Sequence, residues 1–120
     1  MSEFSFNRSV RILRPADFQR VFADPLKSGN SEFTVLATAN GLPHARLGLA
    51  IAKKRVRLAV DRNRIKRHVR ESFRHHQAEL PALDIVVMAR NGVEKRTNEK
   101  LVVSLDKHWQ SLIKKCASSS

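Results

Sequence analysis

The positive charge of this sequence is concentrated in one segment, residues 46–76. The segment carries eleven Lys and Arg residues against Asp61 and Glu71, so eleven minus two gives +9 of the chain's +12. A compact body with this much like charge repels itself unless a polyanion shares the field, and nucleic acid is the usual polyanion. A membrane surface would instead require exposed Trp or Leu beside the basic face of a helix. The segment therefore predicts nucleic-acid binding.

Within this segment, the spacing of residues predicts one long helix over residues 59–77. Ile65, Val69 and Phe73 fall on one stripe that can pack on a sheet. Beside this stripe runs a row of cations spaced four residues apart, made of Arg62, Lys66, Arg70 and Arg74. Like charges at this spacing destabilise an isolated helix by roughly 0.2–0.5 kcal/mol per pair. A solvated helix face normally mixes both signs, so an external row of phosphates explains this face better.

The residues before this helix predict a shorter helix and then a β-hairpin. Pro15 is favoured at the first position of a helix, and Asp17 adds a carboxylate to its first turn. We expect that helix to end near residues 24–25. Residues 32–38 alternate and are rich in Phe, Thr and Val, and residues 46–52 read as the returning strand after turn residues at 40–43.

The residues after the basic helix predict one strand and one more helix. Residues 83–89 are almost continuously apolar, which is typical of a strand buried on both faces. A last helix begins at Thr97 or Asn98 and carries an apolar stripe of Leu101, Leu105, Trp109, Leu112 and Ile113. The expected fold class is α+β, a small mixed β-sheet with three helices in the order α-β-β-α-β-α, similar in kind to small ribosomal proteins.

The length of 120 residues fits a single RNA-binding domain over residues 1–120, with a folded core at about 8–115 and a tail at 116–120. The longest clean apolar run, residues 85–89, is far shorter than the roughly 20 residues of a membrane span. Cys116 is the only cysteine, which suits a reducing compartment. We therefore expect a cytoplasmic protein with no membrane partner and no obligate protein partner.

The centre of the basic segment resembles the signature of the protein subunit of bacterial ribonuclease P. The resemblance rests on Lys53-Lys54 and on residues 59–70, with a complete Arg62-Asn63-Arg64 core. It extends outward through residues 14–22 and 80–87, in order and at matching spacing, and so covers most of the chain.

The resemblance implies a specific activity and fold. In that family, a small protein joins a large catalytic RNA, and the complex removes the 5′ leader from precursor tRNA. The RNA and its magnesium ions perform the hydrolysis, whereas the protein binds the catalytic RNA and the leader and contributes no catalytic side chain. The chain would then be the non-catalytic subunit of an RNA-based endoribonuclease. The family fold has a left-handed βαβ crossover, against the usual right-handed rule.

The family's functional positions can be carried over onto this sequence. The leader cleft corresponds to Phe18, Phe22 and Leu36, although some relatives place an aromatic residue where Leu36 stands. Phe18 and Phe22 have a plain alternative as core residues of an amphipathic helix. The expected RNA-binding positions are Lys53, Lys54, Arg57, Arg62, Asn63, Arg64, Lys66, Arg67, Arg70 and Arg74.

Other candidate sites are weak. The adjacent His75 and His76 point about 100° apart on a helix and have no further ligand at suitable spacing, so we expect no metal site in the protein. His68 and His108 are expected at the surface or near RNA, and Trp109 in the core. The eleven acids are scattered, whereas nucleases that use their own side chains gather carboxylates around metals.

Two other function classes stay open at this point. A ribosomal or other structural RNA-binding protein would share the charge and the basic helix but take part in no turnover. A DNA-reading helix is the third possibility, yet nothing in the sequence supplies the dimer seam or the second helix of a helix-turn-helix.

Overall fold

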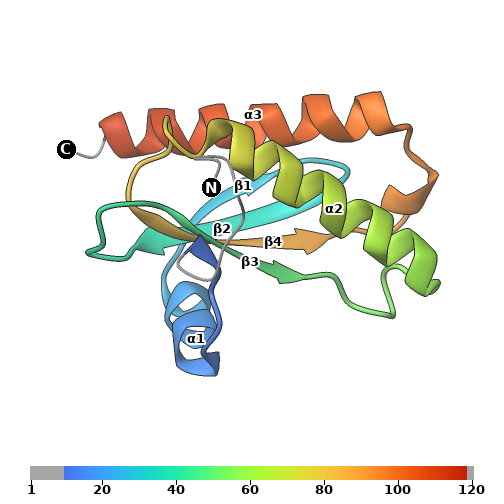
Figure 1. Cartoon of the computed structure of the whole chain (residues 1–120), viewed down its shortest axis with the longest axis horizontal. Coiled ribbons are helices and arrows are strands. Elements are labelled where there is room, and N and C mark those ends of the chain that lie inside the picture. The colour runs from blue at the N-terminus through green and yellow to red at the C-terminus, as the bar shows by residue number, and fades with distance from the viewer. Residues whose placement is uncertain (1–9, 119–120) are drawn as a thin grey trace, which may run out of the picture.

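A four-stranded sheet with α2 and α3 on one face and α1 on the other forms the body of the protein (Figure 1). The structure is a computed structural model that describes residues 10–118, so the expected start of the core near residue 8 lies outside the described residues. The elements are α1 (Pro15–Ala23), β1 (Leu26–Gly29), β2 (Phe33–Ala39), β3 (Arg46–Ala50), α2 (Ala59–His76), β4 (Leu83–Ala89), the 3-10 helix η2 (Val93–Lys95) and α3 (Asn98–Ser118).

The strand order is β1-β2-β4-β3, with β4 antiparallel to β2 and parallel to β3. This confirms the α+β class and the mixed sheet. The predicted hairpin between residues 32–38 and 46–52 is wrong, because β4 lies between these two strands. The reason is burial: β4 is buried on both faces and takes a central position, which leaves β3 at the edge. β3, α2 and β4 form the βαβ unit for which the family resemblance predicts a left-handed crossover.

The hairpin that does form joins β1 to β2, and the sequence analysis missed β1. β1 has only four residues, Leu-Lys-Ser-Gly, and no β-branched side chain to signal a strand. Asn30 closes the turn, where its Oδ1 accepts hydrogen bonds from the backbone N–H groups of Glu32 and Phe33 at 3.1 and 2.9 Å. The element order therefore contains one strand more than predicted.

The predicted apolar stripes of the two long helices are confirmed. Ile65, Val69 and Phe73 of α2 are fully buried, as are the α3 residues Leu101, Leu105, Trp109 and Leu112. The Trp109 indole Nε1–H donates to the Ser72 hydroxyl at 2.7 Å, and its ring meets Phe73 edge-on at a centroid distance of 6.2 Å. α3 continues to Ser118, beyond the expected core boundary at residue 115, and Cys116 packs against the core.

The prediction that His108 lies at the surface or near RNA is wrong. Its side chain is buried between α3 and β1, and Nδ1 lies 2.7 Å from the Ser28 hydroxyl. Position 108 follows Leu105 by three residues and precedes Leu112 by four, so it belongs to the inward stripe of α3. Burial lowers the pKa of His108 to about 4, and the imidazole is therefore neutral near pH 7.

A fully buried carboxylate, Asp84 of β4, fastens α1 to the sheet. Arg46 of β3 donates two hydrogen bonds to it, from Nε at 2.7 Å and from Nη2 at 2.6 Å. Asn40 donates another at 3.1 Å, and Arg20 of α1 donates from Nη2. Arg46 also lies 3.5 Å from the carboxylate of Asp17. Two residues of α1 are thus tied to one charge network that starts inside the sheet.

The pKa values of this network show which effect dominates. Burial raises the pKa of the Asp84 carboxyl, but hydrogen bonds from Arg46 and Asn40 and the charges of Arg46 and Arg20 outweigh it. The net pKa lies below the ordinary value, so the folded protein holds Asp84 ionised. Hydrogen bonding to Asp84 likewise raises the pKa of Arg46.

We predict that Asp84→Asn lowers the free energy of unfolding by on the order of 3 kcal/mol at pH 7, because it removes the buried carboxylate charge that Arg46 and Arg20 both bind. Because the pKa of Asp84 is lower in the folded than in the unfolded protein, its carboxylate contributes its full stabilisation above the unfolded-state pKa of about 4. That contribution is lost as the pH falls through the folded-state pKa. The gap between wild type and variant should therefore shrink from pH 5 to pH 3 in urea unfolding. Glu79→Gln, an exposed charge, is the control and should change little. Equal stability of wild type and Asp84→Asn at pH 7 would contradict this role.

Candidate RNA-binding site

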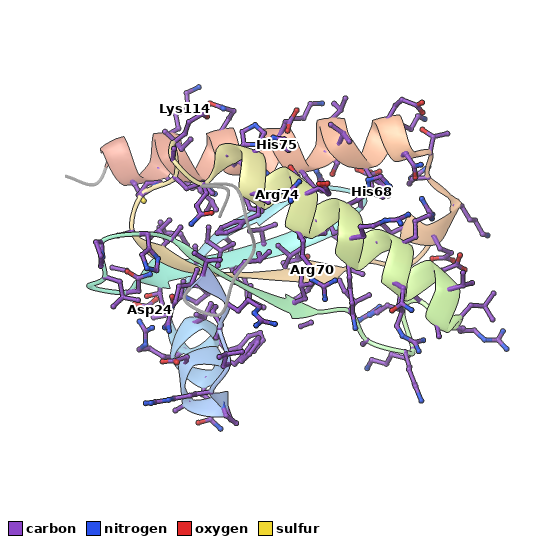
Figure 2. The ribbon with its side chains drawn as sticks, in the orientation of Figure 1. Asp24, His68, Arg70, Arg74, His75 and Lys114 are labelled. Carbon is purple, nitrogen blue, oxygen red and sulfur yellow. The ribbon has the colours of Figure 1, made fainter. Side chains whose placement is uncertain are left out.

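Seven of the ten predicted RNA-binding side chains are uncommitted within the fold. They make no hydrogen bond or ion pair with another residue of the range 10–118. Figure 2 shows Arg70 on the side of α2 away from α3, opposite His68 and His75, which lie on the α3 side. Three of the seven come from the loop between β3 and α2 and four from α2 itself: Lys53, Lys54, Arg57, Asn63, Lys66, Arg67 and Arg70.

The other three predicted side chains are engaged inside the protein. The Nη1 group of Arg62 donates to the backbone carbonyls of Val56 at 2.9 Å and Arg57 at 2.8 Å, which holds the β3–α2 loop against the helix. Arg74 pairs with Glu71 at 2.5 Å. All three stay predicted RNA-binding positions, but in the free protein their guanidinium groups already bond within the fold.

Arg64 is the third engaged side chain, and it connects two helices. Its Nη1 donates to the Asn98 side-chain oxygen and its Nη2 to the Glu94 carbonyl, both at 2.8 Å. These bonds join the start of α2 to η2 and to the start of α3. The two arginines of the Arg62-Asn63-Arg64 core therefore brace the fold, and Asn63 between them is exposed.

On the α1 face of the sheet, three rows of residues run across β2, β4 and β3. The first row holds the Asp84 network, with the cross-strand residues Thr38, Asp84 and Arg46. The second row is apolar and buried, with Leu36, Val86 and Gly48. The third row is only half-buried and consists of Thr34, Met88 and Ala50, which we call the floor row.

The predicted leader-cleft residues lie at different depths around these rows. Leu36 is 6% exposed and packs under Val21 of α1, so it does not line an open cleft as expected. Its position in the second row, directly beneath α1, is the reason. Phe18 is half-buried against the same cluster, and Phe22, one turn later, is 45% exposed. The open surface begins one row further along, at the floor row.

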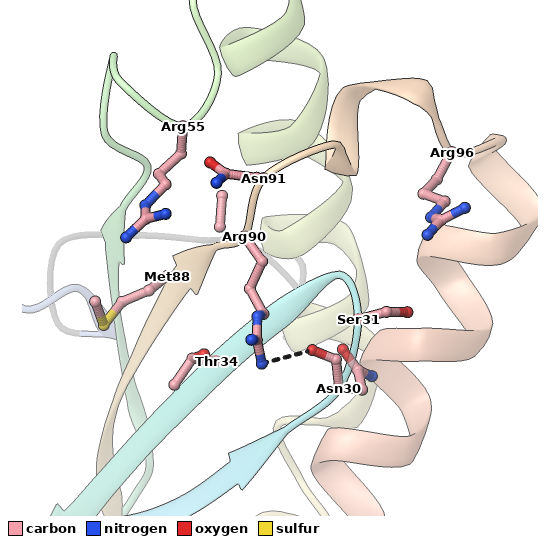
Figure 3. Close-up of a pocket in the computed structure, with 9 residues that line it drawn as sticks. Asn30, Ser31, Thr34, Arg55, Met88, Arg90, Asn91 and Arg96 are labelled. Carbon is pink, nitrogen blue, oxygen red and sulfur yellow. Dashed lines mark hydrogen bonds between the residues drawn. The ribbon is translucent and has the colours of Figure 1, made fainter.

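Beyond the floor row lies a cavity of about 670 Å³ with three arginines in its wall (Figure 3). We call it the arginine cavity. Arg55 and Arg96 approach it from opposite sides, and Arg90 lies between them and donates to the Asn30 carbonyl at 3.2 Å. Thr34, Met88 and Asn91 also line it. None of these residues was predicted, because they come from four separate stretches of sequence.

One carboxylate beside the cavity is already neutralised. Glu32 pairs with the Arg96 Nε at 3.1 Å. A hydrogen bond from Ser31 lowers the pKa of Glu32, and the hydrogen bonds and charge of its neighbours outweigh the opposing effect of burial. The guanidinium groups of Arg55 and Arg90 therefore set the local charge.

The described residues offer no ligand set for a metal ion. Within the described range, no three His, Cys, Asp or Glu side chains lie together in a way that could hold one. Among the helices of residues 10–118, none is both long enough and apolar enough to cross a membrane.

The sequence profile of the Ribonuclease P family matches residues 6–113, nearly the whole described range. The chain belongs to the ribonuclease P protein family. The ribonuclease P protein component of Pseudoalteromonas atlantica is 48% identical over 119 residues and 99% of both chains. That of Methylococcus capsulatus is 50% identical over 117 residues, 98% of this chain and 91% of the relative.

Solved structures of ribonuclease P proteins share the fold. The Staphylococcus aureus protein superposes with a TM-score of 0.78 at 37% identity, over 85% of this chain and 93% of that one. The Thermotoga maritima protein, solved with 1-(4-fluorophenyl)-2-thiourea, gives 0.74 at 32% identity, over 82% and 96%. Membership assigns this chain to the protein subunit of ribonuclease P in tRNA processing, with the RNase P RNA as its partner. The predicted family is confirmed, and a ribosomal or DNA-reading protein is not supported.

We predict that replacing Arg67 and Arg70 with Gln weakens binding to RNase P RNA without lowering the melting temperature, because both side chains are exposed and unpaired among the described residues. Each lost phosphate contact should flatten the plot of log Kd against log salt by about 0.7–0.9. Arg64→Gln is the contrasting variant and should lower the melting temperature. An unchanged salt slope in the double variant would contradict the assignment.

Proposed function

We propose that this chain is the non-catalytic subunit of ribonuclease P and holds two RNA segments at once. The uncommitted cations of α2 and its preceding loop bind the RNase P RNA. The 5′ leader of precursor tRNA crosses the floor row between α1 and the arginine cavity. The RNA, with magnesium, hydrolyses the phosphodiester bond. Precursor tRNA is made in the bacterial cytoplasm, and we place the activity there.

The proposal that α2 binds the RNase P RNA rests on the separation of its buried apolar face from its exposed cations. A helix that only needed solubility would not leave Lys66, Arg67 and Arg70 together without acidic partners. The buried Ile65–Val69–Phe73 stripe and the Arg62 and Arg64 bonds anchor the helix, so the backbone positions that carry these cations are set before RNA arrives. Guanidinium groups fit phosphate oxygens in a planar fork, which favours Arg at such a surface.

The proposal that the leader crosses the floor row rests on the side chains that lie on the α1 face of the sheet. Met88 packs against the cluster under α1 and also lines the arginine cavity, so the floor row is continuous between them. Phe18 and Phe22 supply aromatic surface on one side, and Arg55 and Arg90 supply positive charge on the other. Single-stranded RNA fits such a surface, because its bases stack on aromatic rings and its phosphates meet guanidinium groups. Stacking tolerates many sequences, as leaders of differing sequence require.

The side chains of residues 10–118 do not fit a magnesium site. The most buried carboxylate, Asp84, is occupied by two arginines, and Glu32 is paired with Arg96. Nucleases that work through their own metals hold them with several free carboxylates. We therefore propose that the RNA holds the magnesium ions and that no catalytic step passes through this chain.

The isolated protein should show no cleavage of precursor tRNA in magnesium buffer, and addition of a bacterial RNase P RNA should restore it. RNase-treated, highly purified protein is the sample to measure, with catalytic RNA alone as the second reference. Sustained cleavage by the protein alone would overturn the non-catalytic assignment.

Phe22→Ala should reduce the preference for precursor over mature tRNA while it leaves the melting temperature nearly unchanged. The ring is already 45% exposed, so its removal opens no large cavity. Loss of one stacked base corresponds to about 1 kcal/mol or more, or roughly five-fold in the affinity ratio. Val102→Ala, 42% exposed on α3 at the other face of the sheet, is the matched control. A ratio equal to that of wild type would remove Phe22 from the leader path.

A further inference from the structure

We infer that Gly48 is a positioning residue for leader binding: its lack of a side chain lets the Phe18 ring lie against β3 and so sets where α1 stands. This inference rests on the proposed leader path across the floor row. Gly48 would act through Phe18, without contacting RNA or a charged side chain itself.

The second cross-strand row leaves an open space at Gly48. Leu36 and Val86 fill the row under Val21, and the third position has no side chain. The Phe18 ring occupies that space. A Cβ placed at Gly48 would lie 2.7 Å from Cε1 and 2.8 Å from Cζ of Phe18, and 3.3 Å from Cβ of Ile12. Real Cβ atoms essentially never lie within 3.0 Å of an atom elsewhere in the fold, so the ring would have to move.

The backbone does not require glycine at this position. Of the described glycines, the two with a positive φ angle are Gly41 and Gly92, whereas Gly48 adopts ordinary strand geometry. A glycine inside a strand costs conformational entropy and packs nothing, so it is retained where another group approaches closely. At Gly48 that group is the Phe18 ring.

Movement of the ring is transmitted to the leader path. Asp17 and Arg20 hold α1 to the Asp84 network, so α1 cannot slide along the sheet to relieve the contact. The ring must turn or the helix must tilt around that attachment. Either response changes the position of the aromatic surface beside the floor row, where bases of the leader are proposed to stack.

The experiment compares Gly48→Ala with Gly29→Ala in the holoenzyme reconstituted with RNase P RNA. Gly29 lies in β1, and a Cβ there would meet only the Arg90 Nη1, at 4.0 Å. Gly48→Ala should lower the precursor-to-mature tRNA affinity ratio by about five-fold, the effect of one disturbed stacking contact, with unchanged affinity for the RNase P RNA. Gly29→Ala should match wild type. A folded Gly48→Ala protein with the wild-type ratio overturns the inference.

A double-mutant cycle with Phe18→Ala isolates the ring as the cause. On the Phe18→Ala background, Gly48→Ala should change the affinity ratio and the melting temperature far less than in wild type, because the two contacts below 3.0 Å are gone and only the 3.3 Å approach to Cβ of Ile12 remains. If Gly48→Ala alone fails to fold, the double variant should fold again. An equal penalty on both backgrounds, or a double variant that stays unfolded, overturns the inference.

The two proposals fail in different ways. A wild-type holoenzyme that does not prefer precursor tRNA would refute the leader path, and the melting-temperature cycle would still decide whether Gly48 seats Phe18. A wild-type preference that survives Gly48→Ala refutes the positioning role and leaves the leader path intact.

Discussion

The buried carboxylate of Asp84 holds together the parts of this protein that would otherwise separate. β4 carries it in the middle of the sheet, and its partners come from β3, from the β2–β3 connection and from α1. α1 has only nine residues and buries only Val21 fully, so its apolar contacts alone are few. A buried ion pair is not strong evidence of stability, because desolvation opposes it. Its value here is geometric, since it defines where α1 lies and therefore where the open part of the sheet begins.

α2 serves packing and RNA binding with different faces of one helix. Its cations at four-residue spacing repel one another, and no side chain caps its N-terminus. The helix is stable because Ile65, Val69 and Phe73 are fully buried and because Arg62 and Arg64 bond to backbone on both sides. The Arg-Asn-Arg core of the family signature thus combines two bracing residues with one exposed amide. Substitutions at these three positions should be separated into effects on folding and effects on RNA.

Local patterns in the sequence predicted the helices and strands whose formation depends on neighbouring residues. The bounds of α1, α2, β4 and α3 followed from Pro15, from the helical stripes and from the apolar run at 83–89. The strand order could not be predicted from these local patterns. The position of β4 between β2 and β3 depends on which strand would expose the most apolar surface at the edge, and that requires a comparison of all the strands in the sheet. The same holds for Leu36, which is buried under α1, and for His108, which is buried against β1, because both contacts join elements that are separate in sequence. The arginine cavity joins four stretches of chain, and no spacing rule links Arg55 to Arg90.

The place of β4 in the sheet also has a consequence for synthesis on the ribosome. β4 is the last strand to be made, yet the β1–β2 hairpin and β3 each pair with β4 and not with each other. Until residue 89 has left the ribosome, the β1–β2 hairpin and β3 have no common partner. Residues 46–76, which carry +9 of the chain's +12 and include α2, emerge before the strand that completes the surface beneath the helix. Folding of this subunit is therefore a late, cooperative event dominated by contacts between distant residues, and nascent chains expose a basic amphipathic segment that has yet to find its support.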